Sequence, residues 1–217
     1  MNYPDINVLD PRAIERGSMG IIEAEMGTHS FTPLELQVVK RVIHTTADFE
    51  YKDLIVFHNN PLESALRAIK NGKAIYADTR MAAAGISSGE VSRWGGEVVT
   101  AIQDAAVAAE AQERGITRSM VAMEKMCQRK DVGIYAIGNA PTALFVLMEH
   151  IRQGLVKPEL VIGVPVGFVG AEESKEALLK LDVPAIVIRG RKGGSPVAAT
   201  ILNALLYALR DEAQNNA

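Results

Sequence analysis

The chain has 217 residues, enough for one α/β domain with a buried core, and its 48% hydrophobic and 23% charged residues are ordinary for a soluble globular protein. A net charge of −3 argues against a nucleic-acid-binding protein, although locally placed cations can still attract an anionic ligand. The single cysteine, Cys127, excludes a disulfide framework and a cysteine-based zinc site.

The chain begins without a basic segment followed by an apolar run, and it contains no apolar stretch of membrane-spanning length. We therefore expect a cytoplasmic protein that does not contact a membrane. The polar residues 211–217 are expected to fray. Because no linker or repeat interrupts the chain, we expect one domain over residues 1–217.

The first half of the chain predicts helices separated by short strands. Thr32-Pro33-Leu34-Glu35 combines a capping threonine, a first-turn proline and a glutamate, and predicts a helix from Pro33 to about Phe49. Asn60-Pro61-Leu62-Glu63 repeats this pattern, and Gly72 is placed to end the second helix. Strands are expected at 54–57, 74–77 and 97–102, and helices at 104–115 and 117–129.

The second half contains three wholly apolar segments of strand length, at 133–137, 160–164 and 185–188. Continuous apolar runs are typical of parallel strands that are buried on both faces. Each run leads into a glycine-bearing loop and then a helical pattern. We therefore predict an α/β fold, a three-layer α/β/α sandwich around a mainly parallel sheet, with ligands at the carboxyl ends of the strands.

Three loops follow these strands, at 138–142, 163–170 and 189–196. Glycines let the backbone approach a ligand, and a helix N-terminus behind such a loop offers free N–H groups to an anion. The third loop adds Arg189, Arg191 and Lys192. The alternative is that the glycines only permit tight turns. Neither a phosphate-binding P-loop nor a Gly-x-Gly-x-x-Gly after a strand is present.

His44 is the most informative single residue. In the helix from Pro33, apolar side chains cover one arc, and His44 lies in the middle of the polar arc beside Lys40, Arg41 and Asp48. Imidazole is the side chain best suited to proton transfer near neutral pH, so His44 is a candidate acid. From periodicity alone, a solvated helix face that carries a histidine by chance explains the pattern better than an acid does.

In combination, these segments resemble the precorrin-8X methylmutase family, and the resemblance runs nearly from end to end. Glu15-Arg16-Gly17-Ser18 resembles its N-terminal substrate segment, and Arg41-Val42-Ile43-His44 resembles the segment with its active-site histidine. Thr117-Arg118-Ser119 resembles a further family element. The segments at 138–144, 163–175 and 190–195 resemble its three late loops. The order, spacing and length of these segments make the resemblance specific.

The resemblance implies an isomerase of cobalamin biosynthesis that needs no cofactor, and the spacing of the histidines in the sequence indicates no metal site. The family moves a methyl group from ring carbon eleven to ring carbon twelve of precorrin-8X or cobalt-precorrin-8, giving hydrogenobyrinate or cobyrinate. It implies a homodimer with its sites near the subunit interface, and a tetrapyrrole as substrate and product. His44 is then expected to act as general acid. The expected substrate-binding residues are Arg16, Ser18, Arg41, Arg118, Asn139, Thr142, Gly193 and Ser195.

Two other functions stay open at this stage. A carrier that holds a corrinoid without converting it needs the arginines and an apolar cavity, but not the imidazole. A nucleotide-binding α/β enzyme would use the glycine loops, and ATP or NAD would then protect it from thermal unfolding.

Overall fold

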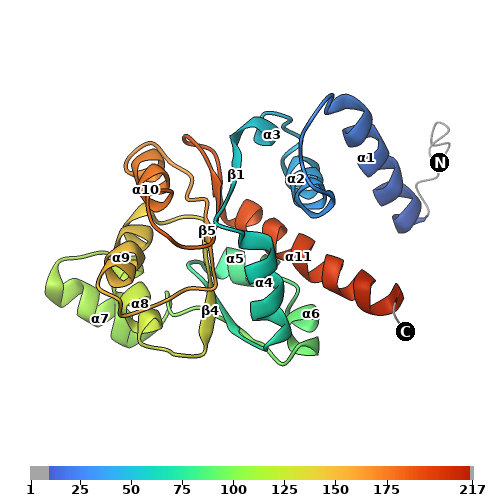
Figure 1. Ribbon diagram of the computed structural model, residues 1–217. Helices are drawn as coiled ribbons and strands as arrows, with labels where there is room; N and C mark the ends of the chain where they lie inside the picture. The colour runs from blue at the N-terminus through green and yellow to red at the C-terminus, as the bar shows by residue number, and fades with distance from the viewer. Residues whose placement is uncertain (1–9, 216–217) are drawn as a thin grey trace, which may run out of the picture.

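The computed structural model, drawn as a ribbon in Figure 1, describes residues 10–215. Within that range the strands form one six-stranded sheet in the order β1-β6-β5-β4-β2-β3. The strands are β1 (Ile55–His58), β2 (Ala74–Ala77), β3 (Val98–Val99), β4 (Val132–Ile137), β5 (Leu160–Gly163) and β6 (Ala185–Ile188). Every neighbouring pair is parallel except β1 and β6, which run antiparallel at one edge. This confirms the prediction of a mainly parallel sheet.

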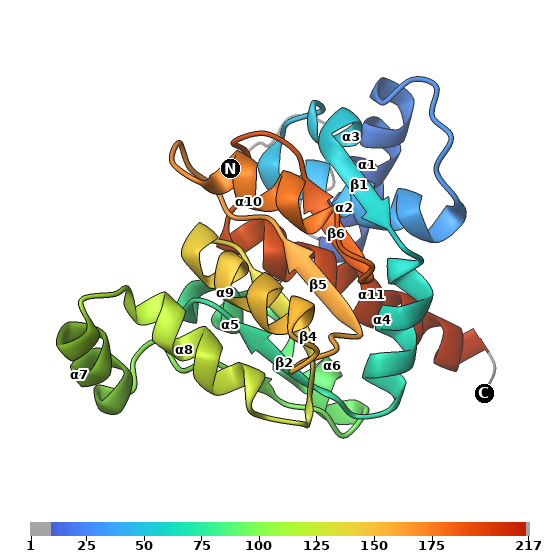
Figure 2. The ribbon, with the colours of Figure 1, turned by 60° about the vertical axis from the view of Figure 1, so that its left-hand side comes forward.

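Helices cover both faces of the sheet, which confirms the predicted three layers (Figure 2). One face packs against α2 (Pro33–Thr46), α4 (Pro61–Lys70), α5 (Arg80–Gly85), α6 (Ser88–Arg93) and α11 (Ser195–Asn215). The other face packs against α8 (Arg118–Cys127), α9 (Pro141–Arg152) and α10 (Ala171–Leu178), with α7 (Ala105–Arg114) outside α8. The short α3 (Tyr51–Leu54) leads into β1. Helix α1 (Pro11–Glu25) lies outside α2 (Figure 1).

The sheet is central because its strands are apolar on both sides. All six residues of β4 are buried, and from Ile134 onward successive residues enter different cores. Ile134 belongs to the core that α2 and α11 complete, whereas Tyr135 belongs to the core under α8, α9 and α10. The continuous apolar runs of the sequence therefore correspond to strands with helices on either side, as expected for a doubly covered sheet.

Most expected elements are present, and their bounds differ where local geometry intervenes. The helix expected to reach Phe49 ends at Thr46, because Ala47 adopts a left-handed conformation and its N–H bonds to the carbonyl of Ile43. The strand expected at 97–102 shrinks to Val98–Val99, since this edge strand pairs only with β2 over two residues. Residues 211–215 were expected to fray but continue α11, whereas 216–217 lie outside the described residues.

Candidate active site at the carboxyl edge of the sheet

The parallel strands β2, β4, β5 and β6 all end at one edge of the sheet, and the loops that follow them meet there. Asp78, the first residue after β2, holds the loop between β4 and α9. Its side chain is 1% exposed and accepts hydrogen bonds from the N–H groups of Gly138, Asn139 and Ala140 at 3.0, 2.8 and 3.0 Å. Burial raises the pKa of Asp78, while these three donors act in the opposite direction.

The loop between β6 and α11 packs directly against its neighbours. The Thr79 and Ser195 hydroxyl oxygens are 2.7 Å apart, and the Gly194 N–H donates to the carbonyl of Val164 at 2.9 Å. Gly193 has φ +149°, and a Cβ at this position would lie 2.1 Å from the Val164 carbonyl oxygen. The glycine is therefore required by close packing between two loops. Gly193 and Ser195, expected to bind substrate, shape this edge through their backbone and a buried hydroxyl.

Arg118, Thr142 and Asn139, three of the predicted substrate-binding residues, lie at the same edge of the sheet. The hydroxyl oxygens of Thr117 and Thr142 are 3.2 Å apart, so the N-termini of α8 and α9 lie side by side. Arg118 is the first residue of α8 and is exposed, and Asn139 is an exposed residue of the β4–α9 loop. The structure thus brings together two helix N-termini and a guanidinium, an arrangement suited to carboxylates.

Apolar side chains stand exposed at this edge, in the loop between β5 and α10. Phe168 is 82% exposed and Val169 is 90% exposed, and the guanidinium carbon of Arg191 lies 5.4 Å from the centre of the Phe168 ring. The sequence interpretation quoted this loop only for its glycines and missed its apolar residues. A signal was present, because Val-Gly-Phe-Val lies where a solvent-facing loop is usually polar.

His44 lies on the solvent-exposed face of α2, two residues before that helix ends. Its neighbour Thr45 contacts Thr200 of α11, with the hydroxyl oxygens 2.9 Å apart. Asp48 was predicted to lie beside His44 on the polar arc of the helix. In the structure it accepts a hydrogen bond from Lys192, which keeps the pKa of Asp48 low. The His44 ring has no hydrogen-bond partner within residues 10–215, so both ring nitrogens are available to a ligand.

The remaining predicted residues lie further along α1 and α2. Arg41 donates to Glu15 at 2.8 Å and stacks over the Tyr207 ring at 4.6 Å. The Ser18 hydroxyl donates to the carbonyl of Ile14 in its own helix at 3.0 Å. The guanidinium of Arg16 lies 3.7 Å from the carboxylate of Asp10.

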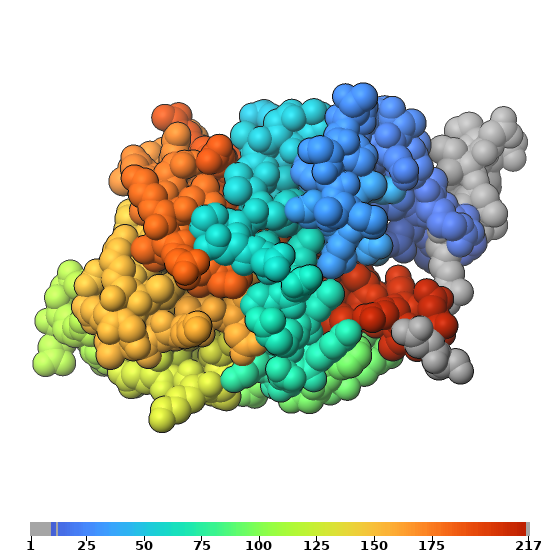
Figure 3. Space-filling model, viewed as in Figure 1, coloured from blue at the N-terminus to red at the C-terminus, as the bar shows by residue number. Residues whose placement is uncertain are grey.

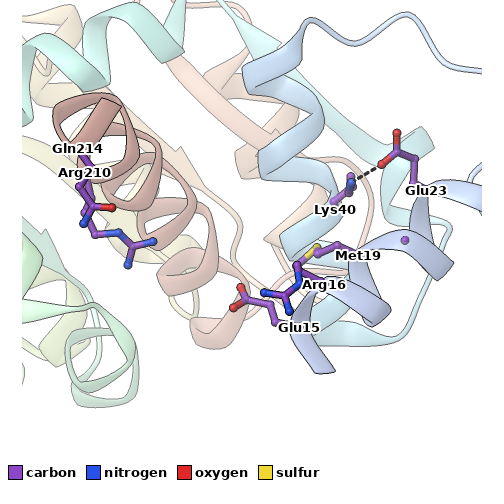
Figure 4. Close-up of a pocket in the computed structure, with 8 residues that line it drawn as sticks. Glu15, Arg16, Met19, Glu23, Lys40, Arg210 and Gln214 are labelled. Carbon is purple, nitrogen blue, oxygen red and sulfur yellow. Dashed lines mark hydrogen bonds and ion pairs between the residues drawn. The ribbon is translucent and has the colours of Figure 1, made fainter. Parts of the chain in front are cut away.

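Arg16 also lines a hollow of about 740 Å³ between α1, α2 and α11, drawn in Figure 4. There Lys40 of α2 is bonded to Glu23 of α1 at 2.6 Å, while Arg210 and Gln214 project from α11. None of the carboxyl-edge residues lines this hollow. The structure thus divides the predicted residues into an edge group and an α1–α2 group.

The seam between α2 and α11 connects the two groups. Ser195 begins α11 at the edge, Thr200 meets Thr45 beside His44, and Tyr207 meets Arg41. From Ser195 to Arg210 the helix rises about 22 Å at 1.5 Å per residue. His44 therefore lies between the groups. In the space-filling view the end of α11 emerges next to α1 and α2 (Figure 3).

Two features of the described residues bear on other kinds of site. No helix within residues 10–215 is long and apolar enough to cross a membrane. No three His, Cys, Asp or Glu side chains of that part of the chain gather as a metal site would require. Cys127 is buried, and burial raises the pKa of its thiol to about 12.

Comparison with known proteins identifies the family. The sequence model of precorrin-8X methylmutase matches residues 13–208. The cobalt-precorrin-8 methylmutase of Priestia megaterium is 45% identical over 91% of this chain and 88% of its own. The precorrin-8X methylmutase of a Sinorhizobium species is 40% identical over 91% and 95%. The crystal structure of the Thermus thermophilus precorrin-8X methylmutase covers 93% of this chain and 99% of its own, with 43% identity and a TM-score of 0.85. The chain therefore belongs to the precorrin-8X methylmutase family, and it is an isomerase of cobalamin biosynthesis.

Proposed function

We propose that this isomerase moves a methyl group from ring carbon eleven to ring carbon twelve of precorrin-8X or of cobalt-precorrin-8. The observation that carries the proposal is the match to precorrin-8X methylmutases over more than nine tenths of the chain, in sequence and in fold. Relatives named for each of the two substrates match at 45% and 40% identity, so both substrates belong in the test. The products are hydrogenobyrinate and cobyrinate.

The substrate lies along the α2–α11 seam with its macrocycle over His44. Two features support this placement: His44 is exposed without a protein partner, and cationic groups lie on either side of it. Arg41 and Arg16 take carboxylates at one end, where Ser18 lines the approach. At the other end Arg118 and the N–H groups of the β4–α9 loop take further carboxylates. For Arg41 to bind, a substrate carboxylate replaces that of Glu15, an exchange between like partners.

His44 acts as the general acid. Its imidazolium donates a proton, or a strong hydrogen bond, to the conjugated system near ring C and makes that system more electron-poor. The bond from the methyl carbon to carbon eleven then breaks as the bond to carbon twelve forms. The proton returns to His44, so substrate and product contain the same atoms. Acid assistance of this kind is typically worth about 10²–10⁴-fold in rate.

The exposed apolar side chains of the β5–α10 loop supply the other half of the site. A tetrapyrrole has broad apolar faces with carboxylates at its rim. Phe168 and Val169 offer an apolar surface, and Arg191 next to Phe168 offers a cation. Contact between these groups and the substrate removes apolar surface from water and holds the macrocycle in one orientation.

The protein works as a cytoplasmic homodimer in this proposal. The resemblance to a dimeric family supports the assembly. So do Ile14 and Ile21, which are 42% and 59% exposed on α1 although they are apolar. Light scattering coupled to gel filtration tests it. A mass of about twice 23.4 kDa is expected, and a monomer at micromolar concentration would contradict the assembly.

Turnover tests the function itself. The purified chain is mixed with precorrin-8X and, separately, with cobalt-precorrin-8, and conversion is followed by visible absorbance and by chromatography of the products. Conversion of either substrate at unchanged mass is the expected result. Tight binding of both without conversion would show a carrier, and neither binding nor conversion would contradict the proposal altogether.

A further inference from the structure

Lys175 is a fully buried lysine in α10, and its environment gives it one specific partner. Its side chain is 0% exposed, and its ammonium nitrogen donates to the carbonyl oxygen of Lys192 at 2.8 Å. Lysine is almost never fully buried without a partner, because removing its charge from water costs several kcal/mol. A methionine or leucine would fill this space without that cost. The lysine therefore calls for an explanation that packing does not supply.

Lys192, whose carbonyl accepts the hydrogen bond from Lys175, is also fixed through its own side chain. Lys192 lies in the β6–α11 loop, next to Gly193. Its ammonium donates to Glu50 at 2.6 Å and also to Asp48, and it lies 5.8 Å from the centre of the Tyr51 ring. Asp48 and Glu50 belong to the turn between α2 and α3. The carbonyl of Lys192 thus contacts α10, while its side chain contacts the turn that follows α2.

This connection ends close to His44 in the sequence. Asp48 lies four residues after His44, just beyond the end of α2. We propose that Lys175 is a positioning residue of the reaction: through Lys192 and Asp48 it holds the β6–α11 loop and the end of α2 in one arrangement, and so places His44 against the substrate. The inference rests on the proposed role of His44. It assigns no contact between Lys175 and the substrate.

The charged groups around Lys175 are few. The carboxylates of Glu172 and Glu176 in α10 favour the ammonium form of Lys175. Glu176 also forms an ion pair with Arg189 at 3.3 Å. Strand β6 carries no titratable residue, and α9 has its titratable residues only near its last turn. The Lys192 ammonium is directed toward Asp48 and Glu50. Burial lowers the pKa of Lys175 to about 8, so its ammonium becomes a neutral amine in an accessible pH range. A neutral amine donates a weaker hydrogen bond.

Three variants test the inference. Lys175→Met removes the donor at nearly constant volume. Lys192→Met removes the contact with Asp48 and Glu50 but keeps the carbonyl that Lys175 holds, and its partly exposed position favours normal folding. Lys180→Met is the matched control, because Lys180 is exposed just beyond α10. Circular dichroism and thermal melting establish that each variant folds.

Each variant is assayed for kcat and KM with the substrate that the wild type converts, between pH 6.5 and 9.5. We expect kcat to fall about tenfold to a hundredfold in Lys175→Met and in Lys192→Met, the range that a loosened reacting geometry can produce. Because both substitutions break one connection, the double variant should be no slower than the slower single variant. Above pH 8 the wild-type kcat should decline relative to the kcat of Lys175→Met.

A readout independent of turnover separates this inference from the proposed function. Hydrogen exchange should accelerate at residues 190–194 and 48–51 in Lys175→Met, and not in Lys180→Met. If the wild type converts neither substrate, the proposed function fails, while exchange still reports whether the connection exists. A folded Lys175→Met variant with the kcat of the wild type would overturn the inference. If Lys175→Met does not fold, a Lys192→Met variant with the kcat of the wild type would overturn it. Strictly multiplicative effects of the two substitutions on kcat would also overturn it.

Discussion

Asp78 offers a sharp test of how the edge of the sheet is built. Its carboxylate is buried and accepts three backbone N–H groups of the β4–α9 loop, the loop that carries Asn139. Asp78→Ala leaves all three donors without this partner. Asp78→Asn keeps the shape and one acceptor oxygen, but it turns an NH₂ group toward a backbone N–H.

The expected magnitudes follow from burial. Gly138 and Ala140 are buried, so water does not replace the lost acceptor at their N–H groups, whereas Asn139 is exposed and can be hydrated. Each buried donor left unpaired costs about 1–3 kcal/mol, so we expect Asp78→Ala to lower the free energy of unfolding by about 2–5 kcal/mol. Asp78→Asn leaves about one donor unpaired and should cost about 1–3 kcal/mol. For a chain of this size, each kcal/mol corresponds to about 2–4 °C in Tm.

Urea denaturation followed by circular dichroism measures these differences, and turnover is recorded on the same samples. Asp104→Asn serves as the control, because Asp104 is exposed and its side chain forms no cap hydrogen bond, so its effect should stay within about 0.5 kcal/mol. We expect the order wild type, Asn, Ala in both stability and activity. An Asp78→Ala protein as stable as the control would refute the role given to the three hydrogen bonds.

Three further predictions concern single residues of the site and its support. Gly193→Ala should lower Tm and abolish turnover, because its Cβ would collide with the Val164 carbonyl, whereas Gly190→Ala, with open space around it, should cost only about 1–2 kcal/mol for its positive φ. Equal effects of the two changes on Tm and kcat would contradict the packing argument. Arg41→Lys should raise KM about tenfold at unchanged kcat, since a two-pronged carboxylate contact becomes a point charge; a fall in kcat alone would contradict a binding role. Because burial lowers the pKa of Lys175 to about 8, the native state releases this proton before the unfolded chain does at about 10.5. The stability of the wild type should therefore rise relative to Lys175→Met between those pH values, by up to about 3 kcal/mol in urea titrations, and a constant difference would contradict the burial.

Much of the fold was predictable because short sequence patterns determine where most of its helices and strands begin and end. The capping threonine, proline and glutamate at 32–35 form the expected cap, with the Glu35 carboxylate accepting from the Thr32 N–H at 2.8 Å. The apolar runs at 133–137, 160–164 and 185–188 became β4, β5 and β6 with bounds within a residue or two. The antiparallel direction of β1 was not predictable, because it depends on which edge the strand joins and not on its own four residues.

The segments that form the candidate site were predictable, but the side-chain contacts between them were not. Glycine loops and a histidine on the polar face of a helix can be recognised from the sequence alone. The hydrogen bond between Lys192 and Asp48 cannot be predicted in this way, because the two residues are 144 positions apart and His44 is much nearer to Asp48 in the sequence. Asp78 and Lys175 escaped notice for a related reason. Each is a charged residue buried by tertiary packing, and nothing in its own sequence neighbourhood distinguishes it from a solvated one.

The most direct test of the central claim compares wild type with His44→Ala and His44→Gln, measuring corrinoid binding by fluorescence quenching and turnover by visible absorbance. His44 is exposed and without a protein partner, so neither substitution should alter Tm, and binding should stay within a few-fold of wild type. Loss of an acid should lower kcat by about 10²–10⁴-fold in both variants. Full turnover by folded His44→Ala would contradict the account, because the methyl shift would then proceed without the group placed at its centre.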